Sequence, residues 1–185
     1  GGFDRISTGF PGAVRHGVIE TAPNLDPLWK QFHLADELSA LLKRPARVAN
    51  DATVQGFGAI SGKGVELVIT LGTGLGSALF IDGISLPNLE LAHHPFRASN
   101  TYEELLGQKA LEREGKKKWN KQLQKAIEQL FNLFYYDRLL VGGGNAEHID
   151  FKLPESVHQI PNIAGIIGGV ALWDSAAIGA VTRVD

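Results

Sequence analysis

Residues 65–71 form a nearly unbroken apolar run, VELVITL. Successive side chains of a strand point to opposite faces of its sheet, so an apolar run of this kind is typical of a strand covered on both faces. Sheets of that kind occur in α/β proteins, where helices pack on either side. The chain has 185 residues, 44% of them hydrophobic, which is enough to fill one ordinary domain or two small ones. We therefore expect an α/β fold.

A second strand is predicted to start near Ala46 and to end at Asn50 and Asp51, with helix-compatible residues after them. In open α/β sheets, ligands bind at the carboxyl ends of strands. An ionised Asp within reach of a hydroxyl can act there as a general base. The dipole of the following helix favours the anion, so we expect Asp51 to stay ionised easily. An ordinary N-cap is the alternative, since Asn and Asp both cap helices well.

Helical spacing of apolar residues predicts the helices. One helix is predicted over residues 33–42. It lies between a predicted strand at 5–8 and the strand that starts near Ala46, and this order suggests a parallel strand–helix–strand unit. Further helices are expected over 102–113, 119–134 and 164–180. The third of these four carries a core-facing stripe: Trp119, Leu123, Ala126, Ile127, Leu130, Phe131 and Phe134. The last is rich in Gly and Ala, which permits close approach to a neighbouring element.

Glycine-rich turns follow two of the predicted strands. The first contains Gly72, Thr73, Gly74 and Gly76, and the second, after a short strand at 138–141, contains Gly142, Gly143 and Gly144. Glycines let backbone N–H groups approach an anion, and a threonine adds a hydroxyl donor. Both turns indicate phosphate or nucleotide binding, although the Gly-Lys-Ser/Thr ending of a Walker loop is absent. A glycine-rich hairpin without a ligand is the alternative.

Glu90, His93 and His94 stand close together in the chain. A Glu and a His three residues apart are possible metal ligands on a helix, but no third or fourth ligand is apparent. Hydrogen bonding to a polyhydroxylated substrate fits better, because Glu accepts and His donates or accepts. For His94, a structural role is the alternative.

Lysines gather at Lys116, Lys117, Lys118 and Lys121. Such a cluster is either a solvated helix face or a contact for an anionic substrate. The net charge of −2 gives no indication of nucleic-acid binding. No apolar run is long enough to span a membrane, so a cytoplasmic location is the default expectation.

The order of these motifs resembles the ROK family of sugar kinases, which belongs to the actin-like ATPase and hexokinase superfamily. The resemblance is carried by Asn50-Asp51-Ala52, by LGTGLGS at 71–77, by Glu90-Leu91-Ala92-His93 and by Gly142-Gly143-Gly144-Asn145. Three further stretches are similar to the polyphosphate glucokinase branch: PNLELAHHPF at 87–96, TYEELLG at 101–107 and KKKWNK at 116–121.

The resemblance implies a two-lobed actin-like ATPase (ribonuclease H-like) fold. The small lobe would cover residues 1–50, completed by a C-terminal helix at 171–185, and the large lobe residues 51–170. The implied reaction transfers a phosphoryl group from polyphosphate and/or ATP, with Mg²⁺, to the 6-hydroxyl of glucose or a similar hexose. A cytoplasmic homodimer is expected, with neither a nucleic acid nor a membrane as partner.

The family's functional residues match particular positions of this chain. Asp51 matches the catalytic base, and Asn50, Glu90, His93 and Glu103 match sugar contacts, with Glu104 in place of Glu103 if the register differs by one. The turn with Gly72, Thr73, Gly74 and Gly76 matches the second phosphate loop. Gly142, Gly143 and Gly144 match the adenosine-side loop.

Two departures from the family pattern have consequences. Many members carry a cysteine-rich zinc site, and this chain has no cysteine, so zinc is not expected. The first phosphate loop of the family, an Asp-x-Gly-Gly-Thr-like segment, is absent, so we expect N-terminal strands of the small lobe to be missing. A non-catalytic sugar-binding or regulatory ROK-type protein is the alternative function, against which Asp51 argues. Glu90 and His93 argue against an actin-type structural protein.

Overall fold

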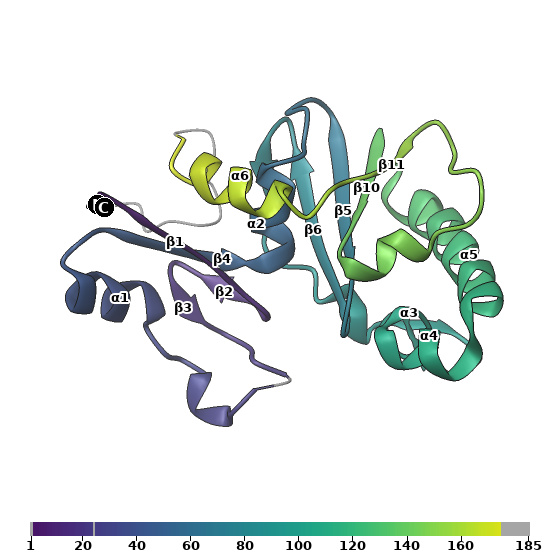
Figure 1. Ribbon diagram of the computed structural model, residues 1–185, viewed down its shortest axis with the longest axis horizontal. Coiled ribbons are helices and arrows are strands. Elements are labelled where there is room, and N and C mark those ends of the chain that lie inside the picture. Colours follow the sequence, from purple (N-terminus) through teal and green to yellow (C-terminus); the bar gives the residue numbers. More distant parts are fainter. Residues whose placement is uncertain (1, 24, 175–185) are drawn as a thin grey trace.

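The computed structural model describes residues 2–23 and 25–174 of the chain. The chain forms two parts side by side, a smaller N-terminal part around a two-stranded sheet and a larger part around a five-stranded sheet (Figure 1). We propose that the small and large lobes divide between residues 50 and 51, where a strand of the first sheet ends and a helix begins.

The small part is the expected parallel strand–helix–strand unit. Its sheet pairs β1 (Ile6–Phe10) with β4 (Ala46–Asn50) in parallel, and α1 (Leu34–Leu42) lies between them in the chain. The connection also holds the hairpin of β2 (Val14–Arg15) and β3 (Val18–Ile19) and a 3₁₀ turn, η1 (Pro27–Trp29). Its buried core consists of Phe10, Ile19, Leu34 and Val48.

The large sheet has the strand order β11-β10-β5-β6-β7. Its strands are β5 (Val65–Leu71), β6 (Leu75–Ile81), β7 (Ile84–Ser85), β10 (Arg138–Gly142) and β11 (Val157–Gln159). The first three in that order run parallel, and β6 and β7 continue antiparallel. The prediction that β5 is covered on both faces is confirmed. Leu67, Ile69 and Leu71 pack in the cluster that includes α5, whereas Val68 packs with Ala52 of α2.

Helices cover both faces of this sheet, with α5 (Lys116–Phe134) on one side and α2 (Asp51–Phe57) and α6 (Ala164–Ala171) on the other (Figure 1). The predicted stripe of α5 is buried at Trp119, Leu123, Ala126, Ile127 and Leu130. Phe131 was wrongly predicted to face the core, because it is 39% exposed and packs on the rings of Tyr135 and Tyr136 beyond the helix end.

The single helix predicted over 102–113 is instead two helices, α3 (Tyr102–Leu106) and α4 (Gln108–Glu114). Gly107 between them is extended, with ψ of 172°. A Cβ at this position would lie 3.0 Å from the carbonyl oxygen of Thr73. The break therefore lets the backbone of Gly107 pack on the first glycine-rich turn, which the apolar periodicity alone does not indicate.

The remaining short elements connect these layers. They are η2 (Leu91–His93), β8 (Pro95–Arg97), β9 (Asn100–Thr101) and η3 (Gly144–His148). Among the helices of the described residues, none combines the length and the apolar character needed to cross a bilayer.

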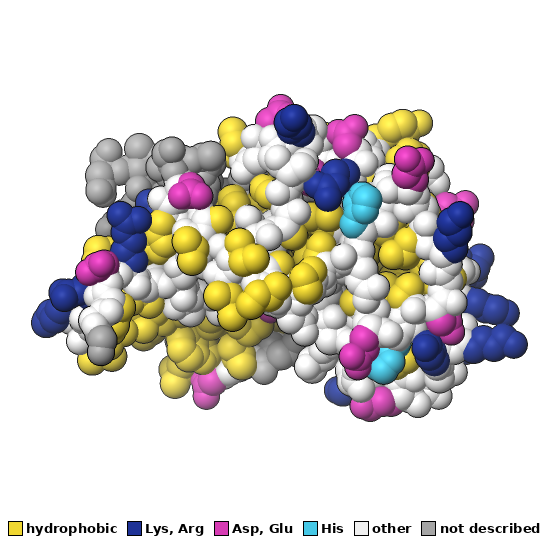
Figure 2. Space-filling view, turned by 45° about the horizontal axis from the view of Figure 1, so that its top comes forward, with side chains coloured by type: hydrophobic (Ala, Val, Ile, Leu, Met, Phe, Trp, Pro, Cys, Tyr) yellow, Lys and Arg dark blue, Asp and Glu magenta, His cyan; other side chains and the backbone are white. Residues whose placement is uncertain are grey.

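The last described helix, α6, ends at Ala171, short of the predicted Ala180. Most of the C-terminal helix expected over 171–185 lies outside the described residues. Glycines allow α6 to pack closely on α2, because a Cβ at Gly168 would clash with the carbonyl oxygen of Val54. Four apolar side chains in or next to α6 stay exposed: Ile163, Ile166, Ile167 and Val170. Figure 2, which turns the top of Figure 1 forward, shows apolar side chains gathered on this face.

This packing predicts opposite effects for two substitutions in the same helix. Gly168→Ala should lower the free energy of unfolding by about 1–3 kcal/mol, because the added methyl has no space. Gly165→Ala is the matched control, since a Cβ there meets nothing within 4 Å, and it should stabilise the protein by up to about 1 kcal/mol through helix propensity. Urea unfolding measures both. Equal effects of the two variants would contradict the close α2–α6 contact.

Candidate active site

A cavity of about 500 Å³ lies where the small part meets the large sheet. Its wall combines the turn after β1, the residues Pro23 and Leu25, the start of α2, the β5–β6 turn and the segment before η2. It brings together all of the predicted site residues except Gly142 and Gly144: Asn50, Asp51, Gly72, Thr73, Gly74, Gly76, Glu90, His93, Glu103 and Gly143. Predicted site residues as far apart in the chain as Asn50 and Gly143 therefore line the same cavity.

Asn50 is the N-cap of α2 and also joins the two parts of the molecule. Its Oδ1 accepts hydrogen bonds from the N–H groups of Ala52 (2.9 Å) and Thr53 (3.3 Å). Its Nδ2 donates to the carbonyl oxygen of Gly12 (3.1 Å) in the turn after β1. The ordinary capping role is thus filled by Asn50, which leaves Asp51 as the first residue of the helix with its carboxylate on the cavity wall.

The carboxylate of Asp51 is held by the backbone, with Oδ1 accepting from the N–H of Ala52 (2.8 Å). Burial raises the pKa of Asp51, and backbone hydrogen bonds only partly oppose this. The expectation that Asp51 stays ionised easily was therefore wrong, because desolvation outweighs the favourable helix N-terminus. A raised pKa brings a carboxylate nearer to the pH at which a general base works well.

Glu90 and His93 reach the cavity from the η2 segment. Burial raises the pKa of Glu90, His93 lowers it, and the charge of Asp51 raises it further. Glu90 and Asp51 therefore act on each other electrostatically across the cavity. Glu90 also has a φ of 32°, an uncommon backbone conformation for a residue with a side chain. Within the described part of the chain, no three His, Asp or Glu side chains group so that they could hold a metal ion.

The two glutamates of α3 have different positions. Glu104 forms a capping box with Thr101, in which each side chain bonds the other residue's backbone N–H. Glu103 lines the cavity and lies against Gly74, where a Cβ would clash with its Oε2. The first of the two alternatives from the sequence is thus the one that reaches the cavity.

The β5–β6 turn is fixed from outside by two elements of the large part. The carbonyl oxygen of Gly72 accepts from the N–H of Gln108 (2.9 Å) and from Nδ2 of Asn145 (3.0 Å). The N–H of Gly72 donates to the carbonyl oxygen of Gly74 (3.1 Å). Because Asn145 follows the three glycines, this bond also ties the second glycine-rich turn to the first.

The three successive glycines have three different surroundings. Gly143 lines the cavity with φ of 84°, and a Cβ there would clash with the backbone of Leu71. Gly142 ends β10, and a Cβ there would clash with Oε1 of Gln55. Gly144 begins η3, and a Cβ there would meet nothing within 4 Å. Neither Gly142 nor Gly144 lines the cavity.

Several lining residues were not predicted from the sequence, among them Pro23, Leu25, Gln55 and Thr70. A signal existed for Gln55, which stands four residues after Asp51 and so shares its helix face. The loop residues carried no such signal, because their place depends on how the small part packs against the large one.

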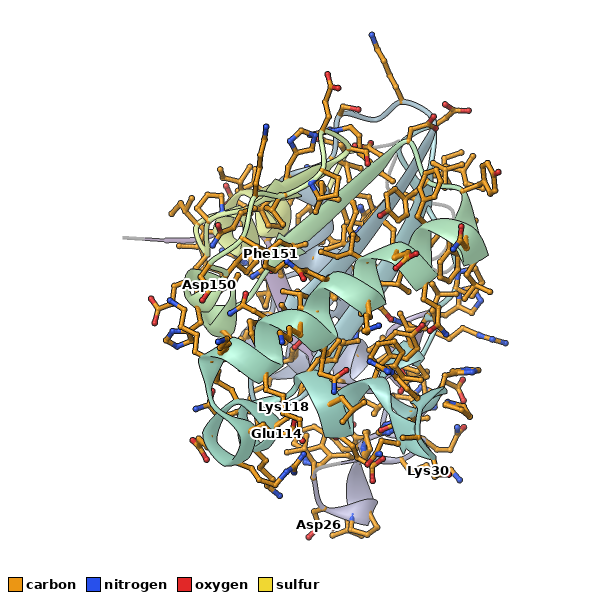
Figure 3. The ribbon with its side chains drawn as sticks, turned by 90° about the vertical axis from the view of Figure 1, so that its right-hand side faces the viewer. Asp26, Lys30, Glu114, Lys118, Asp150 and Phe151 are labelled. Atoms are coloured by element: carbon orange, nitrogen blue, oxygen red, sulfur yellow. The ribbon has the colours of Figure 1, made fainter. Side chains whose placement is uncertain are left out.

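The lysine cluster lies at the start of α5, on the face of the sheet away from α2, and none of its members lines the cavity. Lys118 pairs with Glu114, with 3.3 Å between Nζ and Oε2. Figure 3 shows the two side chains together where α4 meets α5. The placement favours the interpretation as a solvated helix face.

The raised pKa of Asp51 predicts a pH-dependent effect of Asp51→Asn on stability. A carboxyl whose pKa is higher in the folded protein favours folding below its unfolded pKa, about 3.9, and loses that contribution as the pH rises through the folded pKa. Asp51→Asn should therefore raise the melting temperature at pH 7, and the gain should shrink as the pH falls toward about 4. Thermal melts of both proteins over this range check this. Asp4→Asn, at an exposed position, is the control, and a gain that grows at low pH would contradict the prediction.

Comparison with known proteins gives consistent similarities. The model of the ROK family matches residues 1–87. The polyphosphate glucokinase of Mycobacterium tuberculosis is 30% identical over 183 residues, covering 86% of this chain and 66% of that protein. The polyphosphate glucokinase of Mycobacterium leprae is 29% identical, covering 95% and 56% respectively. The chain thus spans between about half and two thirds of the length of these relatives.

Solved structures show the same similarity. The inorganic polyphosphate/ATP-glucomannokinase of Arthrobacter sp. strain KM superposes with a TM-score of 0.80 and 34% identity, covering 91% of this chain and 72% of that one. A ROK family glucokinase of Streptomyces griseus, in complex with glucose and AMPPNP, has a TM-score of 0.68 at 17% identity, with 91% and 81% covered, and shows the fold alone. The expected two-lobed actin-like ATPase fold is confirmed by these matches.

Proposed function

The chain belongs to the ROK family, and from this premise we propose that it carries the hexose-binding and phosphoryl-transfer site of a sugar kinase. The observation that supports this most is the position of Asp51, whose carboxylate shares one cavity with a glycine-rich turn and with the side chains of Glu90, His93 and Glu103. The proposed reaction transfers a phosphoryl group from polyphosphate and/or ATP to the 6-hydroxyl of glucose or a similar hexose.

On the acceptor side, Asp51 orients the attacking hydroxyl and takes its proton. Glu90 and Glu103 accept hydrogen bonds from other sugar hydroxyls, and His93 donates or accepts. The two glutamates come from different segments, the η2 region and α3, so a sugar between them is held from more than one direction. Asn50 acts mainly through position, because its side-chain amide is already bonded to Gly12 and to the start of α2.

On the donor side, the turn at 72–76 and Gly143 present backbone to the phosphates. Mg²⁺ bound with the donor would neutralise the charge on the transferring phosphoryl group. Asp51 and Glu103 are the carboxylates that lie against glycines of this turn, Gly76 and Gly74. A cation bound with the donor would lie near these carboxylates and would be held mainly by phosphate oxygens and water, as Mg²⁺ often is. Most of the catalysis would be positioning and electrostatics, without a covalent intermediate.

Polyphosphate as a donor is supported by the names of the relatives that this chain resembles, two polyphosphate glucokinases and a polyphosphate/ATP-glucomannokinase. A ROK family transcriptional regulator also shares the fold, at 18% identity. Retention of Asp51 favours the kinase over a regulator, because sugar binding alone requires no base.

The proposal predicts that Asp51→Asn separates binding from transfer. The change keeps the shape of the side chain and removes the base, so turnover should fall by about 10²–10⁴-fold while hexose affinity stays within a few-fold. Hexose phosphorylation with ATP and with polyphosphate, together with hexose titration, measures this. His93→Ala is the comparison variant and should weaken hexose binding. Turnover of Asp51→Asn within a few-fold of the wild type would remove Asp51 as the base.

The distance of the lysine cluster from the cavity gives a prediction about the donor. Replacing Lys116, Lys117 and Lys121 with Glu should change the KM of neither ATP nor polyphosphate by more than about twofold, because solvated charges on a distant helix face contribute little. Kinetics at two salt concentrations check this. A selective rise in the polyphosphate KM, with a steeper salt dependence than for ATP, would instead place the lysines on the path of a polyanion.

A further inference from the structure

Asn88 connects the two parts of the molecule, and the proposed mechanism gives it no role. Its half-buried side chain accepts a hydrogen bond through Oδ1 from the backbone N–H of Val14, with 3.2 Å between the two atoms. Val14 begins β2 in the small part, whereas Asn88 lies between β7 and η2 in the large part. The bond therefore joins the small part to the segment that carries Glu90.

Other hydrogen bonds between the parts lie at a different place. Apart from the cap of α2 at the chain junction, they involve α6 or the two residues after it, as when Oγ of Ser7 donates to the carbonyl oxygen of Gly169. Figure 1 shows α6 on one side of the β1–β4 sheet and the β2–β3 hairpin on the other. Among the described residues, Asn88 is thus the one side chain that hydrogen-bonds the large part to the hairpin side of the small part.

Two asparagines hold the same β1–β2 turn (residues 11–14). Nδ2 of Asn50 donates to the carbonyl oxygen of Gly12 (3.1 Å), and Asn88 accepts from Val14 two residues later. Val14, Asn50 and Asn88 also line one small cavity of about 10 Å³, so the two bonds lie close together. Each asparagine stands within two residues of a carboxylate that lines the active-site cavity.

The segment that leads to Glu90 has few other polar anchors. From residue 87 to Glu90, the bond of Asn88 is the only hydrogen bond of the described chain that reaches a residue more than three positions away. The leucines on either side of Glu90 pack against the core of the large part. Glu90 is therefore fixed to the large part by apolar packing, and the small part is fixed to Glu90 by Asn88.

This arrangement determines the width of one end of the cavity. Pro11 and Gly12 of the β1–β2 turn line the cavity, as does Glu90. Because Asn88 fixes how far the turn lies from the Glu90 segment, it fixes the width where the proposed hexose site lies. The donor end is held separately, because the bonds that fix the β5–β6 turn come from the large part alone.

We propose that Asn88 is a positioning residue of the hexose site, which holds the β1–β2 turn at a fixed distance from Glu90 without touching the sugar. This rests on the proposed kinase function and adds to it a residue that sets hexose affinity. A loosened turn leaves Glu90 and the opposite wall too far apart to hold one hexose together. The donor, at the other end of the cavity, is affected little.

The test is Asn88→Ala in the full chain, with glucose as the hexose. The dissociation constant and the KM of glucose should rise about three- to tenfold, as expected for one lost hydrogen bond. The value of kcat should stay within about threefold, because Asp51 keeps its place through the cap at Asn50. The dissociation constant of AMPPNP with Mg²⁺ should stay within about twofold.

Two further variants are the controls. Asn88→Asp keeps the acceptor oxygen for Val14, so its affinity for glucose should stay within about twofold of the wild type. Asn132→Ala, at an exposed position of α5, should change neither affinity. A purely structural role would instead weaken glucose and AMPPNP binding together.

Hydrogen exchange at the Val14 amide tests the bond without reference to catalysis. Its exchange should be about tenfold faster in Asn88→Ala, because the N–H loses its partner. In the wild type, glucose should slow this exchange, since coupling between a ligand and a contact that favours its binding is reciprocal.

The outcomes separate this inference from the proposed function. Wild-type protein that binds glucose but does not phosphorylate it would contradict the proposed function, and the titrations would still decide the role of Asn88. Asn88→Ala that binds glucose within twofold of the wild type, or Asn88→Asp that binds it as weakly as Asn88→Ala, would overturn the inference. Wild-type protein that binds no glucose would overturn both.

Discussion

The cavity depends on one side chain, that of Asn50. Its amide bonds the turn after β1 on one side and the first turn of α2 on the other. The same residue ends β4, which pairs with β1. Through these bonds, the sheet of the small part, the Gly12 turn and the start of α2 keep one relative position. Asp51, the next residue, is directed to the cavity as a consequence, and so is Gln55 one turn later.

The opposite side of the cavity depends on close contact as well as on the hydrogen bonds of Gly72. Side chains would clash with Glu103 at Gly74, with Thr70 at Gly76 and with Leu71 at Gly143. These glycines therefore have a steric reason to be present, besides any contact between their backbone and a phosphate. The strand ends, α2 and α3 approach so closely that the carboxylates of Asp51 and Glu103 lie directly against the turn.

Close packing also explains the electrostatics of the site. Asp51 and Glu90 lose hydration in the cavity wall, and burial is the largest cause of the raised pKa of each. Two carboxylates that raise each other's energy, together with the unpartnered oxygen of Gln55, make the free cavity less stable than an apolar one would be. Sites that bind ligands commonly trade stability in this way.

The sequence alone determined the features that have local causes. The apolar run of β5, the spacing of α1 and α5, and the Asn-Asp pair at the end of β4 each reflect side-chain periodicity or capping, so they could be predicted. Half of the residues that line the cavity were also predicted. Tertiary contact decided the rest. The break at Gly107 is imposed by the Thr73 turn, Phe131 is exposed because α5 ends beyond the core, and Asp51 has a raised pKa because burial outweighs the helix terminus. Gln55 and Gly142 fit together across two elements far apart in the chain, and no local pattern encodes such a contact.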